Sequence, residues 1–156
     1  MRRRLRMTER VRNRVLDDCR TRLPEEACGL LIGRVGDDGW HVCRVFPARN
    51  VARNPRRRFE IDPLLRLDVE KKLRGGPFCV AGHYHSHPNG LAEPSAADRA
   101  AILEKRLLWL IVAPQEDGAM KMTAWQPSDR GFIPVPVTLI ADAPERLKDA
   151  RNEFRQ

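Results

Sequence analysis

The stretch HYHSHPNGLAEPSAAD, residues 83–98, carries the most informative pattern in the chain. Three histidines stand at alternate positions, and a turn-forming segment then leads to Ser95 and Asp98. Side chains of an extended strand alternate between its two faces, so histidines two positions apart project to the same side. A segment that turns and opens a helix can return Asp98 to them. Two imidazoles, one carboxylate and a vacant fourth position are what a catalytic zinc site needs.

Two pairs of histidines satisfy this geometry. We favour His85 and His87 as ligands, because they are nearer to the turn and to Asp98. The pair His83 and His85 is also geometrically possible. His83 follows the apolar run 78–82, so we expect it to be a buried histidine that is hydrogen-bonded or supports the ligands.

A helix over residues 95–106 is predicted after the turn, because Ser95 is a natural N-cap and Asp98 then falls in the first turn. The simplest alternative role for these two side chains is a capping pair, in which the acid reaches back to the cap residue. The histidines would then be polar residues at an exposed strand end. Ser95 has a further candidate role, since a hydroxyl beside the ligands can donate a hydrogen bond to a developing oxyanion.

Amide hydrolysis at such a site also requires a group that takes a proton from water and gives it to the leaving amine. Glu26 is our candidate, because it immediately precedes the apolar run 27–33. Its neighbour Glu25 would face the other way. Glu93 lies in the turn, where we expect an ordinary solvated acid. A solvent-facing acid at the strand entrance remains the alternative for Glu26.

The composition is that of one globular domain, except for its charge. The chain has 156 residues, 42% hydrophobic and 32% charged, with a net charge of +8. Much of the excess is arginine at the N-terminus and within residues 53–58. A solvated basic surface is the simplest explanation, and nucleic acid, anionic membranes and acidic proteins are the partners that such a surface attracts.

The four cysteines form no CxxC or CxxH pattern, which argues against a cysteine zinc site. Cys28 and Cys79 lie in apolar runs and are expected to be buried. The N-terminus has no apolar segment typical of a secretory signal, and no apolar run is long enough to cross a membrane. We therefore expect a cytoplasmic protein that has no membrane partner.

Hydrophobic periodicity predicts strands and helices in irregular alternation, which favours an α/β fold with a mixed sheet flanked by helices. We expect a single domain over residues 1–156, with a frayed basic tail at 1–7. A C-terminal helix is expected within 139–156, centred on 143–154. The other helices are expected from residue 8, from Asp62–Pro63 and over 95–106. The strands are expected at 27–33, 40–46, 78–85, 107–113, 120–126 and 132–138, the last at a sheet edge because of its prolines.

The pattern His85-Ser86-His87-Pro88, six residues, Ser95, two residues, Asp98 resembles the signature of the JAMM (MPN+/JAB) metalloproteases. The segment 24–33 resembles the family's upstream glutamate region, and residues 50–63 resemble its small prokaryotic branch. The likeness covers roughly residues 8–138 and retains every polar residue of the motif.

The resemblance implies a cytidine-deaminase-like three-layer α/β/α fold with a curved mixed sheet. It also implies a zinc-dependent peptidase or isopeptidase in which His85, His87 and Asp98 bind Zn²⁺. Glu26 would be the general acid/base, and Ser95 would assist the oxyanion. The ligand types alone also admit iron or manganese.

Some small members of the family that the chain resembles cut after the C-terminal Gly-Gly of ubiquitin-like or sulfur-carrier proteins, which are therefore the expected partners. Two rival functions remain. One is a nucleic-acid-associated protein that uses its arginines, although the chain has no room for the additional N-terminal module found in DNA-repair-associated relatives. The other is a non-catalytic binding domain that retains zinc. The sequence leaves the oligomeric state open, a homodimer included.

Overall fold

The computed structural model describes residues 2–142, which form an eight-stranded mixed sheet with helices on both sides. This confirms the predicted α/β class. The elements in chain order are β1 (Arg4–Thr8), α1 (Glu9–Arg22), β2 (Cys28–Gly36), β3 (Gly39–Ala48), α2 (Pro63–Leu73), β4 (Cys79–Ser86), α3 (Ala96–Ala100), β5 (Leu108–Pro114), β6 (Met120–Ser128), β7 (Gly131–Val135) and β8 (Val137–Ile140).

The strands lie in the order β7-β6-β5-β4-β2-β3-β1-β8. Antiparallel pairing joins β2 to both β3 and β4, and it also joins β5 to β6 and β6 to β7. Parallel pairing joins β4 to β5, and β1 to both β3 and β8. The two central strands are therefore β2, which directly follows the segment of Glu26, and β4, which carries His85.

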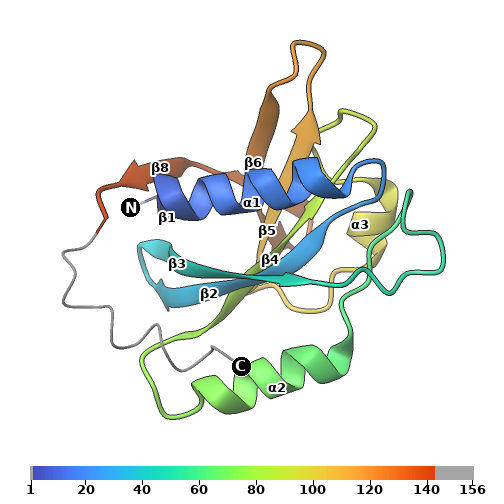
Figure 1. The fold of residues 1–156 in the computed structure, drawn as a ribbon. Helices are drawn as coiled ribbons and strands as arrows, with labels where there is room; N and C mark the ends of the chain where they lie inside the picture. The colour runs from blue at the N-terminus through green and yellow to red at the C-terminus, as the bar shows by residue number, and fades with distance from the viewer. Residues whose placement is uncertain (1, 143–156) are drawn as a thin grey trace.

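Two hydrophobic cores lie on opposite faces of the sheet, which makes the fold three-layered. The larger core packs α1 through Val11, Val15 and Cys19. The smaller core packs α2 through Val69 and lies against β2 and β4. Figure 1 shows α1 above the sheet and α2 below it, with α3 at the right-hand end.

Both long helices begin where the sequence predicts. The side chain of Thr8 caps α1 by accepting a hydrogen bond from the Val11 amide, and Asp62 caps α2 through the Leu64 amide. Pro63 occupies the first turn of α2, where its missing N–H costs nothing. The predicted strands at 27–33, 40–46, 78–85, 107–113 and 120–126 are confirmed with small shifts of their ends.

The prediction of a frayed N-terminal tail is wrong. Residues 4–8 form β1, which pairs with β3 and β8, and Leu5 and Met7 are fully buried. The alternation of arginine with apolar residues in RLRM is a strand pattern, and the run of arginines obscured it. Arg3 stacks over the Trp40 ring at 4.0 Å, so part of the basic charge covers the core.

The single edge strand predicted at 132–138 is two strands at opposite edges of the sheet. β7 continues the hairpin from β6, whereas β8 pairs with β1 at the far edge. Pro136 separates them, and its carbonyl accepts a hydrogen bond from the Leu5 amide. The predicted C-terminal helix at 139–156 begins too early, because β8 includes residues 139 and 140. Its remainder at 143–154 lies outside the described residues.

The helix predicted over 95–106 is also too long, since α3 ends at Ala100. Leu103 is 92% exposed, so this apolar side chain of the predicted helix is not buried against the sheet. A short helix without such packing does not propagate. The prediction that Cys79 is buried is wrong, because this residue begins β4 and is exposed. Cys28 is buried as expected.

Within residues 2–142, no helix combines the length and the apolar character that crossing a membrane requires.

The buried position of β1 yields a stability prediction. Met7→Ala should lower the free energy of unfolding by about 2–5 kcal/mol, because it removes a fully buried side chain from the larger core. Arg6→Ala is the neighbouring control, since Arg6 pairs with Asp38 at the surface and should contribute about 1 kcal/mol or less. Urea denaturation of the three proteins measures both. Equal, small losses would mean that β1 does not belong to the cooperative fold.

Candidate metal centre

The end of β4 and the start of α3 bring His85, His87 and Asp98 together. The two Nε2 atoms lie 3.0 Å apart. Nε2 of His85 is 3.2 Å from Oδ1 of Asp98, and Nε2 of His87 is 3.1 Å from Oδ2. All three side chains are buried. This group could bind a metal ion.

The helix cap orients the carboxylate. Ser95 and Asp98 form a capping box: the Asp98 amide donates to Ser95 Oγ at 3.1 Å, and the Ser95 amide donates to Asp98 Oδ2 at 2.9 Å. The capping alternative is therefore present in the structure. It does not compete with a metal site, because the same carboxylate also faces both imidazoles. One local motif thus fixes the acid at the end of β4.

The chemistry of the donor set fits a metal ion. Nδ1 of His87 lies 2.8 Å from the Leu91 carbonyl, which can only accept. The proton of a neutral His87 therefore belongs on Nδ1, and the lone pair of Nε2 points at His85 and Asp98. The ligands of a tetrahedral zinc, each about 2.0–2.1 Å from the metal, lie about 3.3 Å from one another. The observed separations of 3.0–3.3 Å are close to that spacing.

The electrostatics of the three groups reflect this mutual contact. Burial alone would raise the pKa of Asp98, but its hydrogen bonds with His85 and His87 hold that pKa well below the usual range. Burial lowers the pKa of His85. Burial also opposes protonation of His87, but hydrogen bonds to Asp98 and to the Leu91 carbonyl raise its pKa overall. The carboxylate is therefore ionised, as a metal ligand must be.

Glu26 lies in the same pocket as Asp98 and Ser95, just before β2. Glu26 as a whole residue is 7% exposed, whereas Glu25 and Glu93 are exposed. Burial raises the pKa of Glu26 to about 7; nearby His87 lowers it, and Asp98 raises it further. A carboxyl group with a pKa near the working pH can both accept and donate a proton.

The register of β2 against β4 holds Glu26 next to the histidines. Cys28 pairs with His85, and the Ser86 amide donates to the Ala27 carbonyl at 3.0 Å. The hydroxyl of Ser86 in turn accepts from the Ala27 amide at 2.8 Å. Ser86 was not singled out from the sequence. Its place between two histidines, on the opposite face of the strand, was the available signal.

Asn50 is a second residue that the sequence analysis missed. Its Nδ2 donates to the carbonyls of Glu26 at 2.9 Å and Arg58 at 2.8 Å. Its Oδ1 accepts from the amides of Ala52 at 3.0 Å and Glu60 at 3.1 Å. One amide side chain thus joins the base of the loop before α2 to the backbone of Glu26. An asparagine at the start of an irregular loop is too common to predict this.

His83 is separate from the metal group. Its ring packs on Trp109 with centroids 4.3 Å apart and lies 5.5 Å from Phe59. Burial lowers its pKa to about 3, so it is neutral. The expected hydrogen bond is not formed at Nδ1, which is buried and has no partner within residues 2–142. Phe59 also stacks on His85 at 4.2 Å and covers one face of this ligand candidate.

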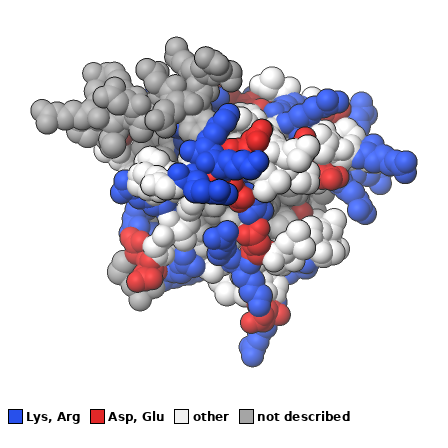
Figure 2. Space-filling view, turned by 90° about the horizontal axis from the view of Figure 1, so that it is seen from below, with Lys and Arg blue, Asp and Glu red and all other residues white. Residues whose placement is uncertain are grey.

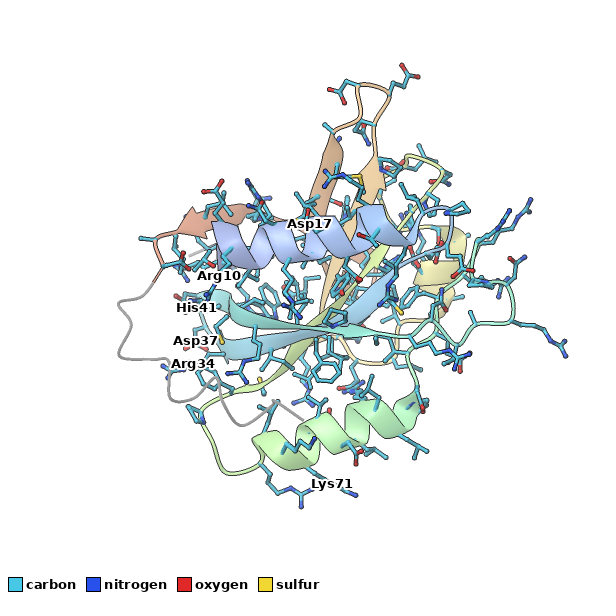
Figure 3. All side chains as sticks on the ribbon, viewed as in Figure 1. Arg10, Asp17, Arg34, Asp37, His41 and Lys71 are labelled. Atoms are coloured by element: carbon cyan, nitrogen blue, oxygen red, sulfur yellow. The ribbon has the colours of Figure 1, made fainter. Side chains whose placement is uncertain are left out.

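His41 is exposed near the β2–β3 hairpin. Figure 3 shows His41 beside Asp37 and Arg34, at the opposite end of the sheet from α3.

A cavity of about 440 Å³ opens beside the metal group on the α2 side of the sheet. Glu26, Ser95 and Asp98 line one part of it, and apolar side chains that include Phe59 and Trp109 line another. The arrangement combines a candidate ligand set, a carboxyl group of raised pKa and space for a substrate.

The pattern behind this geometry is shared with a known family. A family model described as prokaryotic homologs of the JAB domain matches residues 8–128. The chain belongs to this family. The match includes every residue of the candidate site.

Individual relatives support the same conclusion. The chain is 34% identical to the desampylase of Haloferax volcanii over 102 residues, which are 65% of this chain and 70% of the relative. It is 39% identical to the probable TtuB-protein conjugate cleaving protease of Thermus thermophilus over 75 residues, which are 48% of this chain and 47% of the relative.

Solved structures have the same fold. Protein DSY2949 from Desulfitobacterium hafniense superposes with a TM-score of 0.81 and 30% identity, over 91% of this chain and 97% of that protein. A protein from Salinibacter ruber superposes with a TM-score of 0.64 and 25% identity, over 89% of this chain and 94% of its own. The JAB-domain fold that the resemblance implied is confirmed.

The raised pKa of Glu26 predicts a pH-dependent stability in metal-free protein. Protonated Glu26 favours the folded state, and this contribution is lost as the pH rises from the unfolded pKa of about 4.5 through about 7. Glu26→Gln should therefore match wild type at pH 4 and be more stable by about 1–3 kcal/mol at pH 8. Denaturation at both pH values measures this, with exposed Glu25→Gln as the control. A pH-independent difference for Glu26→Gln would contradict the raised pKa.

Proposed function

We propose that this chain is a zinc-dependent peptidase or isopeptidase that cuts the amide bond after the C-terminal Gly-Gly of a ubiquitin-like or sulfur-carrier protein. The observation that carries the proposal is the buried group of His85, His87 and Asp98, in which Asp98 lines the same pocket as Glu26. The names of two relatives, a desampylase and a TtuB-protein conjugate cleaving protease, support the substrate class.

In this proposal His85, His87 and Asp98 hold Zn²⁺. When bound, zinc supplies a Lewis acid and lowers the pKa of water toward neutrality. Two imidazoles and one carboxylate form a known catalytic zinc set. The resemblance to the JAMM metalloproteases, which implies a zinc-dependent enzyme, selects zinc over iron or manganese. The Leu91 carbonyl keeps the proton of His87 on Nδ1, and Phe59 holds the ring plane of His85.

The remaining steps belong to side chains of the pocket. Glu26 takes the proton of the attacking water and later gives it to the leaving amine, for which a pKa near 7 is well matched. Ser95 Oγ accepts a hydrogen bond from the Asp98 amide, so its own O–H can donate to the developing oxyanion. A Gly-Gly tail suits this site, because glycines allow the substrate backbone to approach closely.

Metal content and activity should separate the two roles. Wild type should hold about one zinc per chain, and His87→Ala should lose it because one of three ligands is gone. Glu26→Gln should keep the zinc and lose activity about 10²–10⁴-fold, because it removes only the proton transfer. Elemental analysis and a cleavage assay on the same preparations measure both. Full activity of Glu26→Gln would favour a non-catalytic, zinc-retaining domain.

Substrate choice tests the other half of the proposal. Zinc-loaded protein should cleave conjugates of ubiquitin-like or sulfur-carrier proteins that end in Gly-Gly. It should cleave conjugates ending in Ala-Ala at least tenfold more slowly, because the added methyl groups keep the backbone away from the site. A panel of such conjugates, resolved by mass spectrometry, provides the measurement. The Gly-Gly assignment fails if the panel remains intact or if both tails are cut equally.

A further inference from the structure

The loop before α2 carries a concentration of positive charge next to the candidate site. We call residues 53–58 the arginine loop; it holds Arg53, Arg56, Arg57 and Arg58 and no acidic residue. All four arginines are exposed, and none forms an ion pair with any other residue in the range 2–142. Elsewhere, Arg6, Arg12, Arg20 and Arg22 pair with carboxylates.

Hydrogen bonds hold the backbone of the arginine loop in place. The amides of Arg57 and Arg58 both donate to the Asn54 carbonyl, at 3.1 and 3.0 Å. The Glu26 amide donates to the Pro55 carbonyl at 2.7 Å, and the side chain of Asn50 donates to the carbonyls of Glu26 and Arg58. A strand-like bridge between Asn50 and Ile61 closes the base of the loop. Its backbone is therefore fixed directly to the residue that we assign to proton transfer.

The loop also faces the entrance of the pocket. Arg57 and Arg58 line the same cavity as Glu26, Ser95 and Asp98. In Figure 1 the loop projects at the right of the molecule, near α3. In the view from below, Lys and Arg side chains project at that same right-hand edge (Figure 2).

We propose that the arginine loop is a docking surface for an acidic face of the ubiquitin-like protein whose tail enters the site. The inference rests on the proposed function, and it adds how the folded body of the substrate is selected. The fixed backbone of the loop loses little further conformational freedom when carboxylates approach its four unpaired cations, and guanidinium groups can bind carboxylates in a bidentate manner. Such complementarity acts mainly on association rate and specificity and weakens with salt.

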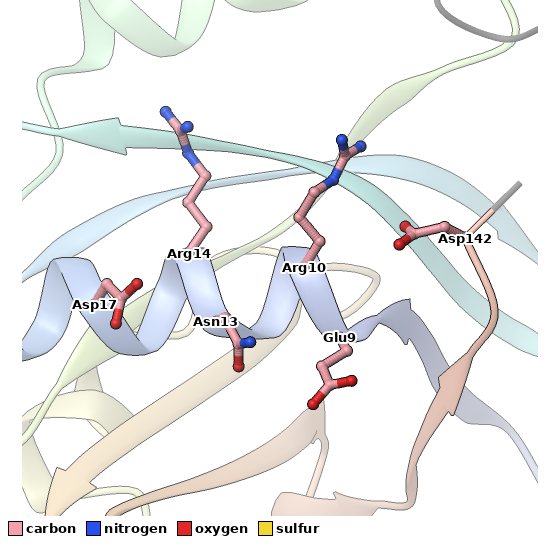
Figure 4. A pocket seen from close by; sticks show the side chains of 6 residues that line it. All are labelled: Glu9, Arg10, Asn13, Arg14, Asp17 and Asp142. Carbon is pink, nitrogen blue, oxygen red and sulfur yellow. The ribbon is translucent and has the colours of Figure 1, made fainter. Parts of the chain in front are cut away.

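The test uses Arg53→Glu/Arg56→Glu, because these two arginines do not line the cavity that contains Glu26. The matched control is Arg10→Glu/Arg14→Glu, which shifts the net charge equally. Arg10 and Arg14 lie on α1 among Glu9, Asp17 and Asp142 (Figure 4), and α1 covers the opposite face of the sheet from α2.

Two substrates separate docking from chemistry. One is a conjugate of an acidic ubiquitin-like protein, and the other is a short peptide with the same Gly-Gly linkage and no folded body. At low salt, charge reversal at Arg53 and Arg56 should lower kcat/KM for both substrates unequally: the loss for the conjugate should be at least tenfold larger than the loss for the peptide. The larger loss should come mainly from a higher KM. The difference should shrink as salt rises, and the α1 control should show no such difference.

Equal losses on both substrates, or an equal loss in the α1 control, would overturn the docking role. Binding of the free ubiquitin-like protein to zinc-loaded Glu26→Gln, with and without the loop reversal, tests docking without cleavage. The proposed function alone fails if wild type cuts neither substrate while this binding still depends on the arginines. If binding is unaffected and the reversal instead abolishes binding of duplex DNA at near-physiological salt, the loop is a nucleic-acid surface and the docking proposal is wrong.

Discussion

The antiparallel register between β2 and β4 is the constraint on which the site depends. It sets Cys28 opposite His85, so Glu26 and His87 continue beyond the paired residues at the same end of the sheet. Ser86 fixes this end through two hydrogen bonds with Ala27. Side chains alternate along a strand, so a slip of one residue would turn both histidines to the α1 face and remove the site. The two central strands thus serve as structural core and as the rigid support of the chemistry.

Burial then determines the chemical character of each group. The same desolvation that keeps His83 and His85 neutral raises the pKa of Glu26 to about 7, whereas direct contact with two imidazoles keeps Asp98 ionised. Carboxyl groups in one pocket are therefore suited to different tasks, metal binding and proton transfer. The two carboxyl groups differ because their surroundings differ. The capping box of α3 orients Asp98, and the enclosed start of β2 desolvates Glu26.

The loop before α2 links the pocket to the surface of the molecule. Phe59 covers His85, Asn50 holds the backbone of Glu26, and the arginine loop between them carries the unpaired charge. In this family fold, a segment without regular structure contacts both the candidate catalytic group and solvent. It is the part of the chain where substrate selection can change while the sheet that carries the chemistry stays the same.

The sequence by itself determined the α/β class, five of the six inner strands, both long helices and the residues that form the candidate metal group. These features depend on local signals: alternation, helix caps and the fixed spacing of His85, His87 and Asp98. Only the tertiary structure showed that RLRM is a strand, that residues 131–140 divide between opposite edges, and that α3 stops at Ala100. Those outcomes depend on pairing partners distant in sequence and on whether an apolar side chain such as Leu103 finds a surface to bury against. The same reason applies to Asn50 and Ser86, whose hydrogen bonds join segments that no local pattern connects.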